Sequence, residues 1–155
     1  MRDKRFIAEH RGGPLTKEQH QQLVQWACDC SFHVFPLFGE EIDHRLEDAI
    51  IVARKWQKGL ATVGDARNAS VNAHALAREL SNPTSIAIAR SVGHAVATAH
   101  MADHSLGAAL FALKAVHSAG QSVDAERNWQ NEHLPPEIKE LVITTIALKE
   151  KHFKI

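Results

Sequence analysis

Imidazole side chains gather in one stretch of this sequence. The segment GHAVATAHMADHSLGAALFALKAVH, residues 93–117, carries His94, His100, His104 and His117 among many alanines. An imidazole can bind a transition metal, exchange a proton near neutral pH, or form hydrogen bonds between packed helices. Which of these roles applies depends on the groups that surround the rings.

Metal binding is one hypothesis for this stretch. In HMADH, His100 and His104 are four residues apart, so on a helix both rings can chelate one ion, with the Asp103 carboxylate nearby. The pair is half a site, because no HExxH glutamate follows His100 and a third ligand would have to come from His74 or His94. A metal-dependent enzyme or metal-binding protein using zinc, iron, nickel or manganese is therefore the alternative function.

Helix packing is the other hypothesis. On a continuous helix, two of the imidazoles align with small residues, the full set being Gly93, Val96, Ala97, His100, His104, Gly107, Ala108 and Phe111. Small residues let a neighbouring helix approach closely, and each buried imidazole then needs a hydrogen-bond partner. This pattern favours histidines that serve architecture within a tight seam, and the same seam could be a homodimer interface.

Other chemical constellations are weaker. Ser91 and Ser105 lack a nucleophile-elbow context, and Gly12-Gly13 follows no strand. A run of acids is expected in the first half of one helix whose second half is basic, an arrangement that the helix dipole favours and that indicates a solvated face. This face could also receive a basic partner; its acids are Glu40, Glu41, Asp43, Glu47 and Asp48, and its bases are Arg54, Lys55 and Lys58.

The tryptophans are interpreted by their place in the helical pattern. Trp26 and Trp56 fall on apolar stripes and are expected in the core, whereas Trp129 is either a packing anchor or an exposed contact. Arg11, in a loop before a helix, is expected to bond carbonyls or a carboxylate at a helix end.

The elements that position these residues are all predicted to be helical. Tyr is absent and no run alternates cleanly, whereas apolar residues recur at helical spacing and Thr16 with Gln19 has the form of a capping box. Helices are expected at about 17–34, 40–58 and 64–80, two within 84–119 with a break at Asp103-His104-Ser105, one after Ser122, and one opened by Pro135-Pro136.

The predicted fold class is all-α, a single domain of six or seven helices packed pairwise as a bundle or short helical stack. It spans residues 1–155, with an N-terminal extension over 1–15 and a frayed tail over 150–155. The net charge is zero, so no sequence-wide field attracts nucleic acid or an anionic membrane. Without an apolar run for a signal peptide or membrane span, a cytoplasmic protein is expected.

The two cysteines are interpreted as reduced thiols. On a helix Cys28 and Cys30 project about 200° apart, which suits neither a disulfide nor shared metal ligation. No cofactor is expected.

Several segments together resemble a known family. They are EHRGGPL, QWACDCS, DHRLEDAIIVARKWQKG, AHALAREL, ARSVGHAVATAHMADHSLGAALFALKAV and ERNWQNEHLPPEI, with the block GHAVATAHMADH the most specific. The chain resembles, from about Phe6 to Leu141, the immunity-protein-five-like group of bacterial immunity proteins from polymorphic-toxin systems.

This resemblance implies an all-helical, non-catalytic domain, made beside a toxin gene, that binds and neutralises the cognate toxin. Toxin neutralisation is accordingly the first functional hypothesis, and a toxin protein is the expected partner. The positions that match the family pattern, as toxin contacts or as core, are Arg11, Asp43, Arg45, Arg54, Trp56, His74, Arg90, His94, His100, Asp103, His104, Trp129 and Pro135.

Overall fold

The computed structural model describes residues 3–155. This part of the chain holds seven α-helices and no strand, which confirms the predicted all-α class. The helices are α1 (Lys17–His33), α2 (His44–Gln57), α3 (Val63–Glu79), α4 (Pro83–Ala97), α5 (His104–Ser118), α6 (Val123–Glu132) and α7 (Pro136–Glu150), with 3-10 turns η1 (Lys4–Phe6), η2 (Glu9–Arg11) and η3 (Phe35–Leu37).

Local capping explains where most helices begin. The Thr16 hydroxyl accepts a hydrogen bond from the Gln19 backbone N–H, and the Thr16 backbone N–H donates to the Gln19 side chain, so the capping box predicted before α1 is confirmed. The Asn82 side chain caps α4, with Pro83 at its first position, and Ser122 caps α6. After α2, Gly59 has a φ of +77°, the left-handed conformation that commonly ends a helix.

The expected start of the second helix is wrong by four residues. The backbone of Asp43 is extended, and its carboxylate accepts the Arg45 N–H, so α2 begins at His44. Glu40 and Glu41 therefore lie in the loop before α2, and only Glu47 and Asp48 occupy the acidic half of the helix. The helix dipole favours the N-cap carboxylate of Asp43 and Glu47 in the first turn.

The break between α4 and α5 comes earlier than predicted. Helix α4 ends at Ala97, Thr98 bonds its hydroxyl back to the His94 carbonyl at 2.9 Å, and α5 starts at His104. His100 thus lies in the turn, and the face predicted for one continuous helix is divided between two. The imidazoles must meet across helices rather than along one.

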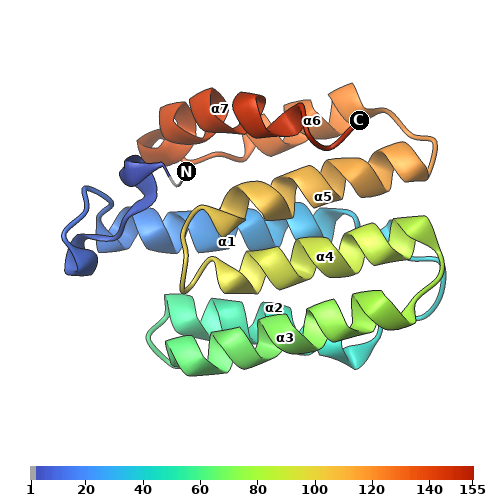
Figure 1. Cartoon of the computed structure of the whole chain (residues 1–155), viewed down its shortest axis with the longest axis horizontal. Coiled ribbons are helices and arrows are strands. Elements are labelled where there is room, and N and C mark those ends of the chain that lie inside the picture. The colour runs from blue at the N-terminus through green and yellow to red at the C-terminus, as the bar shows by residue number, and fades with distance from the viewer. Residues whose placement is uncertain (1–2) are drawn as a thin grey trace.

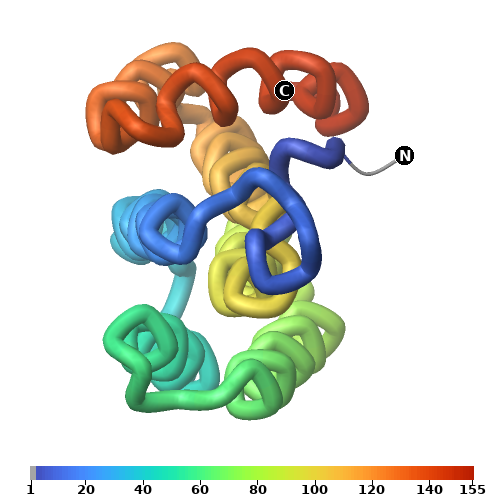
Figure 2. Tube along the Cα trace, turned by 90° about the vertical axis from the view of Figure 1, so that its left-hand side faces the viewer, coloured from blue at the N-terminus to red at the C-terminus, as the bar shows by residue number. Residues whose placement is uncertain are grey.

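The helices run alongside one another in three tiers (Figures 1 and 2). Helices α2 and α3 form one outer tier, α1, α4 and α5 the middle, and α6 and α7 the other outer tier. Helix α4 makes its most extensive contacts with α5 and α3. The Ala-rich faces of α4 and α5 explain this closeness, since alanine lets the helix backbones approach.

Two hydrophobic clusters hold the tiers together. The larger joins α1 through α5 and contains Val24, Leu46, Ile88 and Val92. The smaller joins α1, α5 and α7 to the N-terminal segment, whose Phe6 is fully buried. Helix α7 reaches Glu150, and beyond it the Phe153 ring meets Phe111 at 5.0 Å between centroids.

The structure also bears on the expected state of the two cysteines and on the expected absence of a membrane span. Cys28 and Cys30 are free and buried, and burial raises the pKa of both thiols, that of Cys28 to about 12, which disfavours the nucleophilic thiolate. Over residues 3–155, no helix combines the length and the apolar character needed to cross a membrane.

Candidate functional site

The histidine cluster lies where α3, α4 and α5 meet. The His74 ring of α3 packs against Gly93 of α4, so closely that a Cβ at Gly93 would fall 2.5 Å from Nε2 of the ring. The His94 ring of α4 packs in the same way against Gly107 of α5, where a Cβ would fall 2.7 Å from Nδ1. Each glycine leaves the space that the imidazole of the preceding helix occupies.

Hydrogen bonds link the rings of this cluster to one another and to an arginine. The Arg90 guanidinium donates to His74 Nδ1 at 2.8 Å, which places the proton of that ring on Nε2. The Nδ1 atoms of His94 and His104 are 3.2 Å apart, so one ring donates and the other accepts. His74 meets His94 edge-on at 5.3 Å between centroids.

Electrostatics keep the inner rings neutral. Burial, followed by the nearby Arg90 charge, lowers the pKa of His74 to about 4. Burial, followed by His104 and His74, lowers the pKa of His94 to about 4 as well. At neutral pH both rings are uncharged hydrogen-bonding groups, and so weak a base is poorly suited to proton abstraction.

The metal hypothesis requires a third ligand beside His100 and His104. Among residues 3–155, no group of three or more His, Cys, Asp or Glu side chains could hold a metal ion. The His100 and His104 rings lie 5.8 Å apart between centroids, and His94 contacts His104. The half site seen in the sequence is not completed by the fold of the described residues.

The seam of small residues is filled within the chain itself. Gly93 faces His74 and Gly107 faces His94, and Ala95, Ala108 and Ala112 are fully buried. Much of the seam is therefore buried by α3, α4 and α5 of one chain, although His100, His104, Gly107 and Phe111 are only half-buried. The homodimer stays a prediction.

Three family-pattern residues, the N-cap Asp43 and Arg45 and Arg54 of α2, take part in charged contacts around α2. Asp43 and Arg45 form an ion pair at 3.1 Å, and Arg45 also bonds Glu79 at the end of α3, 2.5 Å away. The Arg45 bond lowers the pKa of Asp43, and the two carboxylates raise that of Arg45. Arg54 pairs with Asp29 of α1 at 3.2 Å. These charges tie α2 to its neighbours.

The three tryptophans differ in their surroundings. Trp26 is buried and donates its indole N–H to the Gln130 carbonyl at 2.9 Å, as expected for a core residue. Trp56 is half-buried beside the His20 ring. Trp129 of α6 is half-buried, and its ring is stacked between those of His33 and His133.

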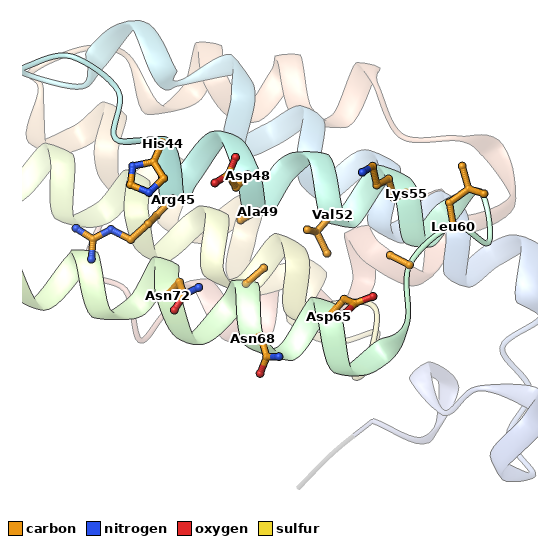
Figure 3. Close-up of a pocket in the computed structure, with 12 residues that line it drawn as sticks. His44, Arg45, Asp48, Ala49, Val52, Lys55, Leu60, Asp65, Asn68 and Asn72 are labelled. Carbon is orange, nitrogen blue, oxygen red and sulfur yellow. The ribbon is translucent and has the colours of Figure 1, made fainter.

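A groove between α2 and α3 is a feature that the sequence analysis did not identify (Figure 3). Its volume is about 440 Å³, and it is lined by both acidic and basic side chains, including Asp48, Lys55 and Asp65, together with the amides of Asn68 and Asn72. The i,i+4 spacing of these asparagines on one face was the available signal. The groove offers polar contacts to a partner.

Comparison with known proteins shows the family to which most of the chain is similar. The model of a family described as "Imm-5 like putative immunity protein" matches residues 13–137. The chain belongs to this Imm-5 like family. No curated protein and no solved structure matches it.

The Imm-5 like match confirms the resemblance and marks its extent. It covers α1 to α6 and the first residues of α7, and it therefore includes the histidine cluster, the groove and Trp129. Arg11, an exposed residue of η2, lies outside the matched range, and Pro135, which precedes α7, lies inside it. The Imm-5 like region is thus nearly the whole helical assembly.

Proposed function

We propose that this protein is a bacterial immunity protein that binds a cognate toxin and neutralises it without catalysing a reaction. Membership of the Imm-5 like family is the observation that carries this proposal. The toxin would be encoded beside this gene, and binding would take place in the cytoplasm. Neutralisation then follows from covering or distorting the toxin's active site.

The structure is compatible with this role because its polar clusters serve packing. The histidines bond one another, and Arg45 and Arg54 bond carboxylates of neighbouring helices. A framework held in this way keeps its outer surface in one conformation, and a preorganised surface loses little entropy when it binds. Such a surface suits a stoichiometric inhibitor.

Growth rescue tests the proposal directly. The toxin from the neighbouring gene would be expressed in a bacterial host with this chain, and with the same gene carrying a stop codon in place of Trp26 as the control. We expect the intact chain to restore growth and the interrupted gene to leave the cells sensitive. Purified chain and catalytically inactivated toxin should also form a complex of one to one stoichiometry by calorimetry.

Equal sensitivity with the intact and the interrupted gene, together with no heat of binding, would remove the toxin as the partner. Rescue at a level far below the amount of toxin would contradict a stoichiometric mechanism, because one bound inhibitor can silence only one toxin molecule.

A further inference from the structure

An exposed aromatic surface lies where the end of α1, η3, the loop before α2 and α6 come together. Its centre is Phe32, whose side chain is 58% exposed although Phe is a large apolar residue. We call this surface the aromatic patch; it consists of Phe32, His33, Phe35, Ile42, Trp129 and His133.

Two neighbouring hollows lie in the aromatic patch, and both are lined by Phe32. One hollow, of about 420 Å³, is lined by Phe32, Phe35 and Ile42 with few polar groups. The other, of about 280 Å³, is lined by Phe32, His33 and Trp129. Phe32 and His33 border both, so the hollows are parts of one continuous surface. Apolar side chains of a partner could occupy both hollows and contact Phe32 in each.

The rings of the patch are held in place before any partner arrives. Trp129 lies between two imidazoles, with centroid distances of 3.6 Å to His33 and 4.0 Å to His133. His33 is in turn bonded to the Glu126 carboxylate at 2.7 Å, and the Phe32 ring rests against Phe35 at 5.2 Å. Large rings with few free rotations contribute contact area at low entropic cost, which is why Trp and other aromatics dominate binding hot spots.

The sequence segment that carries Phe32, His33, Phe35 and Ile42 contains acidic side chains but no basic ones other than histidine. From residue 18 to residue 44 the sequence contains no Lys or Arg, although the chain as a whole has equal numbers of acids and bases. Asp29 and Asp43 are neutralised by Arg54 and Arg45, whereas Glu40 and Glu41, which directly precede Ile42, are exposed and have no ion-pair partner in residues 3–155. A matching surface must therefore be basic at its edge.

From this combination we infer that the aromatic patch is the surface that binds the toxin, through an apolar segment of the toxin that fills the hollows beside Phe32 and is flanked by Lys or Arg facing Glu40 and Glu41. This inference rests on the proposed function. The α2–α3 groove is the competing surface, but it is lined by charges of both signs and contains no Phe or Trp side chain to anchor a partner.

Substitution of exposed residues tests the inference with little risk to folding. We would measure the affinity of the inactivated toxin for the wild-type chain and for Phe32→Ala, with Leu148→Ala on α7 and Leu60→Ala in the groove as controls, since both leucines are as exposed as Phe32, at 63% and 71%. We expect Phe32→Ala to weaken binding by about 30-fold or more and each control to change it by less than about threefold. Unchanged melting temperatures would exclude unfolding as the cause.

The charge component has its own test. Reversal of both glutamates, Glu40→Lys with Glu41→Lys, should slow association at low salt by about tenfold, and the difference should shrink in high salt because screening removes long-range attraction. The matched control reverses two other exposed acids, Glu18→Lys at the other end of α1 with Glu140→Lys on α7, which changes the net charge by the same amount.

The outcomes separate this inference from the proposed function. If the wild-type chain binds the toxin and Phe32→Ala binds equally well, the aromatic patch is wrong and the immunity function stands. If Leu60→Ala loses binding instead, the toxin occupies the groove. If the wild-type chain neither binds nor protects, both the function and the patch are overturned.

Discussion

At the scale of single residues, two glycines decide where the imidazoles lie. The position of a Cβ at Gly93 or Gly107 coincides with the ring of His74 or His94, so a larger residue at either glycine would push that ring out of its hydrogen bonds. The small residues of the sequence thus pair with the histidines, each on a different helix.

Alanine at Gly93 tests this pairing. We expect Gly93→Ala to lower the free energy of unfolding by about 1–3 kcal/mol, because the new methyl group displaces the His74 ring. His74→Ala in the same chain should recover part of the loss, since the clash is then gone, and urea unfolding measures both. The control is Gly64→Ala in the first turn of α3, where the nearest atom is 3.6 Å away. Additive losses in the double variant would contradict the pairing.

Neutral imidazoles also make stability depend on pH. Because burial lowers the pKa of His74 and His94 to about 4, the unfolded chain binds more protons than the folded chain between about pH 6.5 and 4. Stability is therefore complete above pH 6.5 and is lost as the pH falls through this window, by up to about 1.4 kcal/mol per unit and group.

The pH dependence can be assigned to particular histidines by comparing how steeply the free energy of unfolding falls with pH in the wild-type chain and in a variant. Urea unfolding of the wild-type chain at several values between pH 7.5 and 4.5 should show the decline. In His94→Gln the decline should be shallower, because glutamine keeps a polar side chain but does not titrate. The same slope in both proteins would show that another group, such as buried His20, is responsible; burial lowers its pKa too.

At the scale of elements, caps and loops determine where the helices begin. Asp43 ends the loop after η3 and begins α2, and its carboxylate serves both the Arg45 backbone and the Arg45 guanidinium. Arg45 then reaches Glu79 at the end of α3. One residue thereby sets the start of α2 and its contact with the neighbouring helix.

Variants of Asp43 should lose stability according to how many of its hydrogen bonds they remove. Asp43→Ala is expected to lower the free energy of unfolding by about 1 kcal/mol, and Asp43→Asn by less, because the amide oxygen still accepts the Arg45 N–H. Chemical denaturation of the two variants and of Glu41→Ala, an exposed loop control, measures this. A loss with Glu41→Ala as large as with Asp43→Ala would show that the loop, not the cap, matters.

At the scale of the whole molecule, two hydrophobic clusters join the three tiers. The smaller one includes Phe6, which is 0% exposed and lies far along the sequence from its partners Leu106 and Ile138. The N-terminal segment expected to be an extension therefore contributes a buried side chain to the assembly. The single-domain organisation and the frayed tail stay predictions.

Truncation of this side chain measures the contribution. We expect Phe6→Ala to destabilise the fold by about 3–5 kcal/mol, because the neighbours cannot fully close the cavity. Lys4→Ala, at an exposed position of the same turn, should have little effect. Calorimetric or denaturant unfolding compares them, and a loss below about 1 kcal/mol for Phe6→Ala would mean that the segment is held by other contacts.

Local patterns in the sequence determined the helices themselves. The period of the apolar residues, the Thr16–Gln19 box, the Asn82-Pro83 start and the Ser122 cap involve neighbours within one or two turns, and all of them are present in the structure. The family resemblance was also legible, because its motifs are contiguous. The start of α2 differs from the expected residue 40, because the Asp43 carboxylate caps the helix and Glu40 and Glu41 stay in the preceding loop.

Only the tertiary structure decided which side chains meet. His74, His94 and His104 come from three helices, and Phe32 and Trp129 from α1 and α6, so their proximity depends on how helices cross and on which faces they bury. A local pattern specifies the face of a helix but not its neighbour, because long-range packing selects the partner from many apolar faces of similar chemistry. For that reason the sequence indicated the histidines and the small residues but not that Gly93 accommodates His74 and Gly107 accommodates His94, and it indicated Trp129 without the exposed Phe32 beside it.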